Sequence, residues 1–378
     1  MKRAWPWLIR SARAIMDIMP AEQRKAVSSI LLLETLGVKD AVAATPAIDA
    51  LLTTFPGAKI ILAATPASCQ MLRHDNRVSE TIPVAAPWVF STANRKAFAA
   101  SVAKLCAKTY DIAIDLDNNP GNRLMLGLVS SPVRVGHVGQ NDFTLTHKVA
   151  APPTEMSIAD RKLELAIKSG AKMVHSLPSL RLTYSDQRYI QDLLNGLNLS
   201  NKFLVAISAD AADVKCRWPD NYFSELGDRI REIRPDAEVL FFGAPGDSAK
   251  LDQLTKQMAN RPSTLLLSLP RLAAFLERCD LYFGLHSGPS YIAGAIGVRS
   301  ILLYPHQEFF TAPVGPNIRV LAPHNDLAEV KPAFAAEAIV RAIDELPAKA
   351  PEMRGEPLIA KAQNLYFHAV QEVTEPNR

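Results

Sequence analysis

The residues best suited to chemistry in this sequence lie where apolar runs end. Residues 279–304 read CDLYFGLHSGPSYIAGAIGVRSILLY, with His286 directly before a small polar stretch at the expected start of a helix. Gly288 allows a ligand to approach the backbone closely, and Ser287 and Ser290 can either cap the helix or donate to phosphate oxygens. The first backbone N–H groups of a helix also favour an anion such as a diphosphate. Alone, such a pattern is more often a simple helix cap, and a lone histidine is more often structural.

Three further polar loops follow apolar runs and carry charged side chains. They are TLGVKDAVAATPAI (35–48), ISADAADVKCRWPDNYF (207–223) and FFGAPGDSAK (241–250). Taken alone, Asp40 in the first loop and Asp247 in the third are suited to cap the helices expected after them. In the second loop, Ser208, Lys215 and Arg217 are candidate binding residues.

Composition and residue spacing exclude several other classes of protein. The 378-residue chain is 48% hydrophobic and 21% charged, which is typical of a globular protein. No apolar run approaches the roughly 18 residues of a membrane span. The four cysteines form no CxxC pair and the eight histidines form no HxxxH or HExxH pattern. We therefore expect reduced thiols in a cytoplasmic protein, with no disulfide framework and no protein-bound metal.

The positive charge of the chain is concentrated at its N-terminus. Residues 1–25 hold six basic and two acidic residues, which accounts for the formal net charge of +4. One face of a helix would combine Trp5, Leu8, Ile9, Ala12, Ile15, Met16 and Met19. Such a helix either makes a peripheral contact with an anionic membrane or packs on its own protein. The rest of the chain is neutral and has no nucleic-acid-binding motif, so nucleic acid is not an expected partner.

Between these loops, short apolar runs alternate with segments of helical periodicity. Strands are predicted at 28–35, 58–64, 77–84, 110–116, 133–137, 179–184, 202–208, 237–243, 263–268, 279–285 and 299–304. Helices are predicted at 40–55, 66–73, 91–108, 120–131, 155–169, 219–234, 247–259, 270–278, 288–297, 335–346 and 356–372. Near-continuous Val/Ile/Leu strands separated by helices are typical of parallel sheets covered on both faces.

Two consecutive halves of this kind predict two doubly wound α/β domains with a hinge near 184–201. We place the domains at 28–190 and 191–350, after an extension at 1–27. A final helix within 351–378 is expected to pack back toward the first domain. Because ligands of open parallel sheets bind beyond the carboxyl ends of the strands, all four polar loops are expected at that edge of their sheets.

Five blocks of the chain together resemble glycosyltransferase family 9, the ADP-heptose:lipopolysaccharide heptosyltransferases. They are KDAVAATPAIDALLTTFPGAKI, YDIAIDLDNNPGNRLMLGLVSSPVRVGH, KCRWPDNYFSELGDRI, VLFFGAPGD and CDLYFGLHSGPSYIAGAIGVRSILLY. The resemblance runs from about residue 28 to 345. It implies the GT-B architecture, in which two Rossmann-like domains face each other across a cleft.

The resemblance assigns roles position by position. In the family, the aspartate of a Gly-Asp pair is the general base on the acceptor hydroxyl, and Asp40 occupies that place with Lys39 instead of the glycine. The family lysine that meets the diphosphate falls on Cys216, between Lys215 and Arg217. Either flanking cation can neutralise the leaving diphosphate, which leaves the register of that contact open. The tryptophan and proline that follow are expected to start a helix.

The donor pocket is where this chain departs most from the family pattern D-[TS]-G-x-x-H. The donor-sugar aspartate is His286 here, and the histidine five residues on is Tyr291. Ser287 and Gly288 keep the phosphate-binding part. Asp247 lies where the family places an acidic nucleotide contact, so it either binds a ribose hydroxyl or caps its helix. The departures imply either a donor sugar other than heptose or a loss of activity.

The function implied by the resemblance is inverting, metal-independent transfer of heptose or a related sugar from a nucleotide-sugar. An ADP-sugar is the favoured donor, with no further cofactor, and lipopolysaccharide or another envelope glycan is the acceptor. A lipid-linked acceptor fits a basic helix at 1–25 on the inner face of the cytoplasmic membrane. Arg123, Arg134 and His137, with Lys39, are candidates to bind acidic groups of the acceptor; the alternative is that they are solvated surface charges.

Two other functions are compatible with the same features. The changes at the donor pocket also suit a nucleotide-sugar-binding protein without catalytic activity. Another GT-B enzyme, such as a UDP-sugar epimerase, would need several carboxylates and a histidine in one cleft, and the sequence does not assemble that set.

Overall fold

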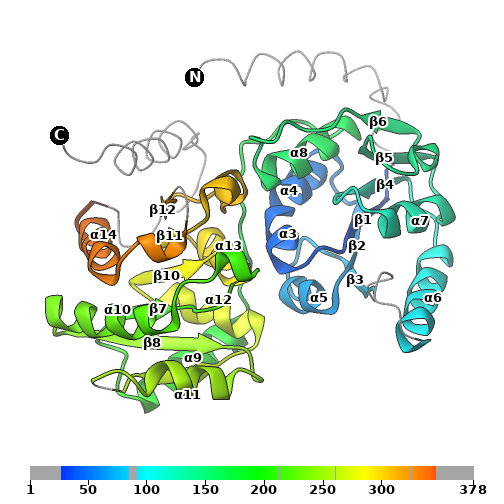
Figure 1. Ribbon diagram of the computed structural model, residues 1–378. Helices are drawn as coiled ribbons and strands as arrows, with labels where there is room; N and C mark the ends of the chain where they lie inside the picture. The colour runs from blue at the N-terminus through cyan, green and yellow to red at the C-terminus, as the bar shows by residue number, and fades with distance from the viewer. Residues whose placement is uncertain (1–26, 85–91, 212, 260, 324–325, 346–378) are drawn as a thin grey trace. The chain divides into compact units, whose positions relative to one another are not determined.

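The chain divides into two compact units, with the boundary between Arg181 and Leu182 (Figure 1). The computed structural model describes residues 27–84, 92–211, 213–259, 261–323 and 326–345. Within these ranges, no helix is long and apolar enough to cross a membrane. Both terminal segments with predicted helices, 1–25 and 356–372, fall outside the described residues.

The first unit is a six-stranded parallel sheet in the order β3-β2-β1-β4-β5-β6. Its strands are β1 (Ser29–Glu34), β2 (Lys59–Ala64), β3 (Glu80–Pro83), β4 (Ile112–Asp115), β5 (Val133–His137) and β6 (His147–Val149). Its helices are α3 (Val38–Ala43), α4 (Thr45–Thr54), α5 (Pro66–Leu72), α6 (Thr92–Cys106), α7 (Pro120–Leu128), the short η1 (Asp142–Thr144) and α8 (Ile158–Lys168).

The alternation of side chains along β1 explains why helices cover both faces of this sheet. Ile30 and Leu32 point into a core shared with α4 and α8, whereas Leu31 and Leu33 point into a second core shared with α6 and α7. Leu32 pairs in register with Leu62 of β2 and with Ile114 of β4. The central strand is therefore buried on both faces, and its carboxyl end opens onto the loops.

The second unit repeats the same topology, in the order β12-β11-β10-β7-β8-β9. Its strands are β7 (Phe203–Ile207), β8 (Ala237–Gly243), β9 (Ser263–Leu266), β10 (Leu281–Leu285), β11 (Ser300–Leu303) and β12 (Ile318–Leu321). Its helices are α9 (Tyr184–Gly196), η2 (Val214–Cys216), α10 (Asp220–Ile233), α11 (Ser248–Thr255), α12 (Leu269–Arg278), α13 (Gly288–Ile296), η3 (His306–Thr311), η4 (Leu327–Glu329) and α14 (Pro332–Glu345).

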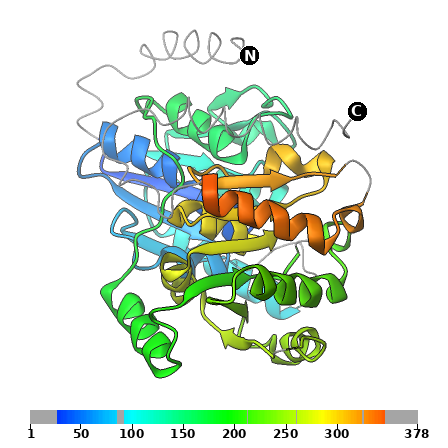
Figure 2. The same ribbon diagram turned by 90° about the vertical axis from the view of Figure 1, so that its left-hand side faces the viewer.

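Helices α10 and α14 pack side by side over one face of the second sheet (Figure 2). Phe283 of β10 lies in that core, where it meets Trp218 at the start of α10. On the opposite face, Tyr282 contacts Phe242 of β8. Helix α9, at the predicted hinge, packs against α12 of this unit, and Gln187 donates a 2.8 Å hydrogen bond to the side chain of Glu277.

The predicted strands and helices agree with the structure except at a few places. The predicted helix 40–55 is two helices, because Pro46 has no N–H to donate to the carbonyl of Val42; the hydroxyl of Thr45 donates to that oxygen instead, at 2.8 Å. The predicted strand 179–184 is wrong, because Thr183 caps α9, a helix that was not predicted. Strands β6 and β12 were not predicted. Each has at most four residues and includes a charged side chain, which leaves little apolar signal.

Candidate functional site

The strand orders place the crevice for ligands at one position in each sheet. In the first unit the chain adds strands on one side of β1 and then returns to add β4 on the other side; the second unit does the same around β7 and β10. Ligands of such sheets bind at this reversal, beyond the carboxyl ends of the two central strands. We therefore describe the side chains at the ends of β1 and β4, and separately those at the ends of β7 and β10.

The predicted base, Asp40, contacts a buried lysine in the first unit. Its carboxylate Oδ1 lies 3.5 Å from Nζ of Lys162, which comes from α8, and the two side chains are 5% and 2% exposed. The same Nζ lies 2.7 Å from Oδ1 of Asp117, just beyond β4. The other oxygen, Asp40 Oδ2, has no hydrogen-bond partner among the described residues. Because Gly37 is the N-cap of α3 and Asp40 makes no cap bond, the interpretation of Asp40 as a helix cap is wrong.

Glu34, the last residue of β1, completes a cluster of three carboxyls around one ammonium group. Its Oε1 accepts 3.1 Å hydrogen bonds from the backbone N–H groups of Leu36 and Gly37. Gly37 has φ 129°, a conformation that favours glycine and turns the chain into α3. Complete burial, and after it the charge of Asp117, hold the pKa of Glu34 well above its ordinary value, while Lys162 opposes them.

Lys162 carries the positive charge of this cluster. Burial alone would lower its pKa, but the nearby carboxyls of Asp117, Asp40 and Glu34 outweigh burial and raise it. The raised pKa favours the ammonium form of Lys162. The side-chain amide of Asn122 further fixes Asp117 by a 3.2 Å hydrogen bond to Oδ2.

The predicted acceptor-binding residues of the first unit lie mostly inside it. Arg123 is fully buried, and its Nε lies 2.9 Å from Oδ2 of Asp115, whose pKa burial raises to about 6 against the charge of Arg123. His137 is also buried, which lowers its pKa, and its Nδ1 lies 2.9 Å from the carbonyl of Ala150. For these two residues the alternative of a solvated surface charge is therefore wrong. Arg134 is half-buried and donates to the carbonyl of Thr144 at 2.6 Å.

Lys39 lies beside the predicted base on α3 and is half-buried. The glycine of this loop stands at Gly37, two residues before the place of the family glycine. The positive φ therefore occurs before the helix, and Lys39 adopts an ordinary helical conformation.

In the second unit, α13 begins directly after β10 without a side-chain cap. Ser287 is the N-cap, but its hydroxyl donates to the carbonyl of Leu285 at 3.3 Å, so the interpretation of this serine as a simple cap is wrong. Ser290 also donates to Leu285, and its Oγ lies 3.1 Å from the hydroxyl of Tyr282. Gly288 is the first residue of the helix and Pro289 follows. The N–H groups of the first turn, rather than these hydroxyls, are thus the groups suited to an anion.

His286 is buried just before this helix and contacts two other buried side chains. Its ring stacks on Tyr304 with the centroids 4.8 Å apart, and its Nδ1 lies 3.6 Å from Sγ of Cys216. His286 and Cys216 are two of the places at which the chain departs from the family pattern. In the fold, these two side chains contact each other. Tyr291, the third departure, is buried and its hydroxyl donates to the carbonyl of Thr311.

The two candidate cations of the second unit lie on either side of Cys216 and point to the surface, whereas the cysteine points inward. Lys215 and Arg217 are exposed, whereas Cys216 between them is buried. The alternation follows from η2, which ends at Cys216, after which Arg217 is extended. Trp218 is buried and donates to the carbonyl of Val330 at 2.9 Å. Pro219 is the N-cap of α10, which confirms that this pair starts a helix.

The remaining predicted donor residues lie at the ends of β7 and β8. Ser208 is buried directly after β7, and its Oγ accepts a 3.4 Å contact from the N–H of Asp210. Burial raises the pKa of Asp210. Asp247 is at the N-cap position of α11, yet its Oδ2 accepts a 2.7 Å hydrogen bond from the N–H of Ala244 and none from the helix.

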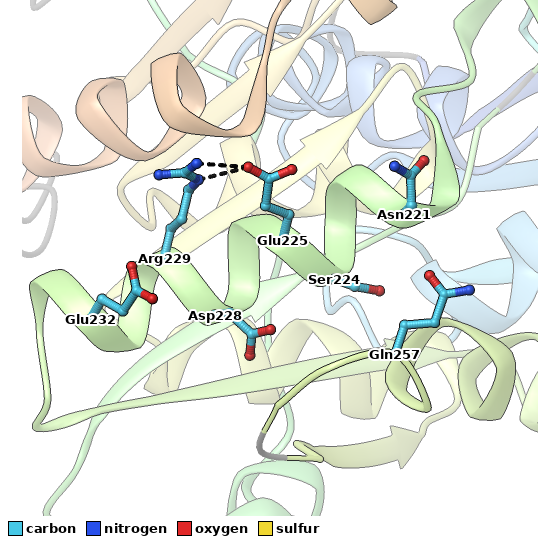
Figure 3. A pocket seen from close by; sticks show the side chains of 7 residues that line it. All are labelled: Asn221, Ser224, Glu225, Asp228, Arg229, Glu232 and Gln257. Atoms are coloured by element: carbon cyan, nitrogen blue, oxygen red, sulfur yellow. Dashed lines mark hydrogen bonds and ion pairs between the residues drawn. The ribbon is translucent and has the colours of Figure 1, made fainter.

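A surface hollow of about 330 Å³ runs along α10 in the same unit (Figure 3). It is lined by Asn221, Ser224, Glu225, Asp228, Arg229, Glu232 and Gln257. Arg229 and Glu225 form an exposed 2.8 Å ion pair there, and none of the predicted site residues lines the hollow. It is therefore a feature of the helix surface and not the predicted donor pocket.

Three functional candidates were missed by the sequence analysis. Glu34 and Asp117 stand at the ends of apolar strand runs, so their positions carried a signal that could have been used. Lys162 carried none, because it lies within an ordinary amphipathic helix. No group of three or more His, Cys, Asp or Glu side chains suited to a metal ion occurs within the described part of the chain.

Two Rossmann-like units, each with polar side chains at its switch point, define a protein of the GT-B class, as predicted. The sequence model of glycosyltransferase family 9 (heptosyltransferase) matches residues 99–336. The chain belongs to this family and is a glycosyltransferase, which confirms the family and enzyme class predicted from the sequence.

Similar proteins include curated and solved members of the family. Lipopolysaccharide heptosyltransferase 3 of Escherichia coli is 21% identical over 273 residues, covering 70% of this chain and 79% of that protein. The glycosyltransferase family 9 structure from Veillonella parvula has a TM-score of 0.74 at 18% identity, covering 84% of this chain and 98% of that chain. Escherichia coli ADP-heptose heptosyltransferase II has a TM-score of 0.69 at 20% identity, covering 84% and 99%.

Proposed function

We propose that this glycosyltransferase moves a heptose or related sugar from an ADP-sugar to a lipopolysaccharide or other envelope glycan, with inversion and without a metal. The observation that carries the proposal is the pair of polar sites at the switch points. One offers the carboxylate Asp40, held by Lys162. The other offers an uncapped helix start at Ser287, with the exposed cations Lys215 and Arg217 on either side of Cys216, whose Sγ lies 3.6 Å from Nδ1 of His286.

The chemistry follows from these groups. Asp40 takes the proton of an acceptor hydroxyl while that oxygen forms a bond to the anomeric carbon of the donor. The bond from that carbon to the diphosphate breaks, and the nucleoside diphosphate leaves with the electron pair. The N–H groups at the start of α13, together with Lys215 or Arg217, neutralise the developing charge. Because Asp40 is buried, its carboxylate has to become accessible before an acceptor hydroxyl can reach it.

Related proteins support the identity of the donor and the acceptor. A solved Escherichia coli heptosyltransferase with a TM-score of 0.67 and 19% identity carries ADP, and the curated relative is a lipopolysaccharide heptosyltransferase. We extend both to this chain as proposals. The basic residues 1–25 would then hold the enzyme peripherally on the cytoplasmic face of the membrane that contains the acceptor.

The test combines donor binding with turnover. Binding of ADP-, GDP- and UDP-sugars is measured by calorimetry, and release of nucleoside diphosphate is followed with lipopolysaccharide precursors as acceptors. We expect an ADP-sugar to bind best and to turn over, and Asp40→Asn to lose turnover by a factor of about 10² or more while it keeps donor affinity. Turnover by Asp40→Asn at the parent rate would remove Asp40 as the base.

The contact between Cys216 and His286 favours one second candidate. Both side chains replace charged residues of the family pattern and both are buried, so the pocket is altered where the donor sugar and its diphosphate would lie. A protein that binds a nucleotide-sugar without transferring it would keep the helix start at Ser287 and tolerate these changes. The same measurement separates the two functions, because this candidate binds an ADP-sugar but releases no ADP with any acceptor.

A further inference from the structure

The cluster at the carboxyl ends of β1 and β4 contains two further carboxyl groups and one ammonium group besides the predicted base Asp40. Glu34, Asp40 and Asp117 surround the one ammonium group of Lys162, and the four side chains come from β1, α3, the β4–α7 loop and α8. Glu34, Asp40 and Lys162 are buried. Asp117 is half-buried as a whole residue, but its side chain is fully buried. Such groups interact far more strongly than exposed ones, because little water screens them.

The two oxygens of Asp40 have different surroundings. Oδ1 faces Nζ of Lys162 at 3.5 Å, whereas Oδ2 is buried and lacks a hydrogen-bond partner among the described residues. Leaving a carboxylate oxygen in this state is costly, unless a ligand supplies the donor that is missing. A sugar hydroxyl is such a donor.

From this geometry we propose that Lys162 is the positioning residue for the base: it holds Asp40 Oδ1 and leaves Oδ2 as the atom that takes the proton of the acceptor hydroxyl. The proposal rests on the proposed function of Asp40. Lys162 touches neither substrate in this scheme and acts through Asp40 alone.

The charges of the cluster agree with this role. Burial raises the pKa of Glu34 and so favours its neutral form. The ammonium of Lys162 then lies between two other carboxyl groups, with Nζ 2.7 Å from Asp117 Oδ1 and 3.5 Å from Asp40 Oδ1. The positive charge therefore stands beside the oxygen of Asp40 that does not take the proton.

The other titratable groups described near Asp40 differ from Lys162 in charge, partner or position. Helix α5, which packs against α3, contributes the thiol of Cys69, whose pKa burial raises to about 11. Asp115, the last residue of β4, forms an ion pair with Arg123. Lys39 lies on α3 itself, one position before Asp40. Lys162 is the cation that forms an ion pair with Asp40, at 3.5 Å.

The first experiment is the pH profile of kcat/KM for Lys162→Met. We expect kcat to fall about tenfold or more, and the acidic limb to move to higher pH by about one unit or more, because a nearby cation favours the ionised carboxylate. KM for the nucleotide-sugar should stay unchanged, and Lys162→Arg should restore much of the rate. An acidic limb that stays in place would overturn the proposal.

Two controls keep a folding defect apart from a positioning effect. Lys168→Met removes a lysine from the same helix whose charge acts on Glu164, and we expect no change in the acidic limb. Lys162→Met combined with Asp117→Asn removes the cation together with its nearest anion, so the buried charge balance is kept. This double variant should fold and still show the displaced limb; a limb at the parent position would contradict the proposal.

A readout without turnover separates this proposal from the proposed function. Protein labelled with carbon-13 at the aspartate carboxyls is titrated by NMR, with Asp40→Asn to assign the signal of Asp40. We expect this carboxyl to titrate at higher pH in Lys162→Met than in the parent protein. Equal titration would refute the role of Lys162, even if the enzyme is active. A clear displacement supports it, even if no tested sugar is transferred.

Discussion

Cys216 Sγ lies 3.6 Å from His286 Nδ1 inside the second unit. These are two positions at which the chain departs from its family pattern, and they are separated by 70 positions in the sequence. In the family pattern that the sequence resembles, a lysine and an aspartate of opposite charge stand at these places, whereas a thiol and an imidazole can both be neutral. The stack of His286 on Tyr304 at 4.8 Å further holds the ring. The two departures therefore contact each other, and we expect their effects on stability to be coupled.

Coupling of this pair can be measured by restoring the family residues. His286→Asp alone places a carboxylate in a buried site without its cation, and we expect it to cost about 2–4 kcal/mol of unfolding free energy. Adding Cys216→Lys should recover about 1 kcal/mol or more, since contacting residues are not additive. Urea denaturation of the four proteins of the cycle gives the coupling energy. Additive costs would show that the two positions act independently.

The raised pKa of Glu34 predicts a dependence of stability on pH. The folded state keeps a proton on Glu34 at pH values where the unfolded chain has lost it. Its contribution is therefore complete below the unfolded pKa and is lost as the pH rises through the folded pKa. Glu34→Gln should stabilise the protein relative to the parent by about 1 kcal/mol at pH 8 and by less at pH 4.

Thermal unfolding from pH 4 to pH 8 tests this prediction, with Glu225→Gln as the matched control. Glu225 is exposed and forms an ion pair with Arg229, so its replacement should change stability by less than about 0.5 kcal/mol at any pH. A difference between Glu34→Gln and the parent that does not grow with pH would show that Glu34 is ionised in the folded protein.

Arg123 is predicted to be essential for stability. Its guanidinium is fully buried against Asp115, so Arg123→Met should cost about 3–5 kcal/mol by leaving that carboxylate unpaired. Asp115→Asn in the same chain should recover a large part of this loss. Denaturation midpoints in urea measure both effects. If Arg123→Met keeps its stability and only raises KM for the acceptor, Arg123 binds the acceptor.

Lys215 and Arg217 should affect donor binding and leave stability unchanged. Both are exposed, so Lys215→Ala or Arg217→Ala should change unfolding free energy by less than about 0.5 kcal/mol. The variant that loses the diphosphate contact should bind the nucleotide-sugar about tenfold more weakly, because a charge-assisted contact is removed. Calorimetry identifies which of the two residues it is. Parent affinity in the double variant would exclude both.

The sequence by itself determined the alternation of strands and helices and the ends of the central strands. Both follow from local patterns: Ile30 to Leu33 read as a strand buried on both faces, and polar loops follow where such strands stop. The positions of Asp40 and of the stretch from His286 to Ser290 at these ends could therefore be predicted. The strand at 179–184 was predicted wrongly, because the capping of α9 by Thr183 is a contact that apolar periodicity does not report.

Only the tertiary structure decided which side chains contact one another. Lys162 meets Asp40, and Cys216 meets His286, because parallel sheets bring loops from distant parts of the chain to one edge. Local periodicity carries no information about such pairs. The same applies to Arg123, whose charge looked solvated in sequence and is buried against Asp115 in the fold. A charged residue in an amphipathic segment is assigned to solvent or to the interior only by what packs around it.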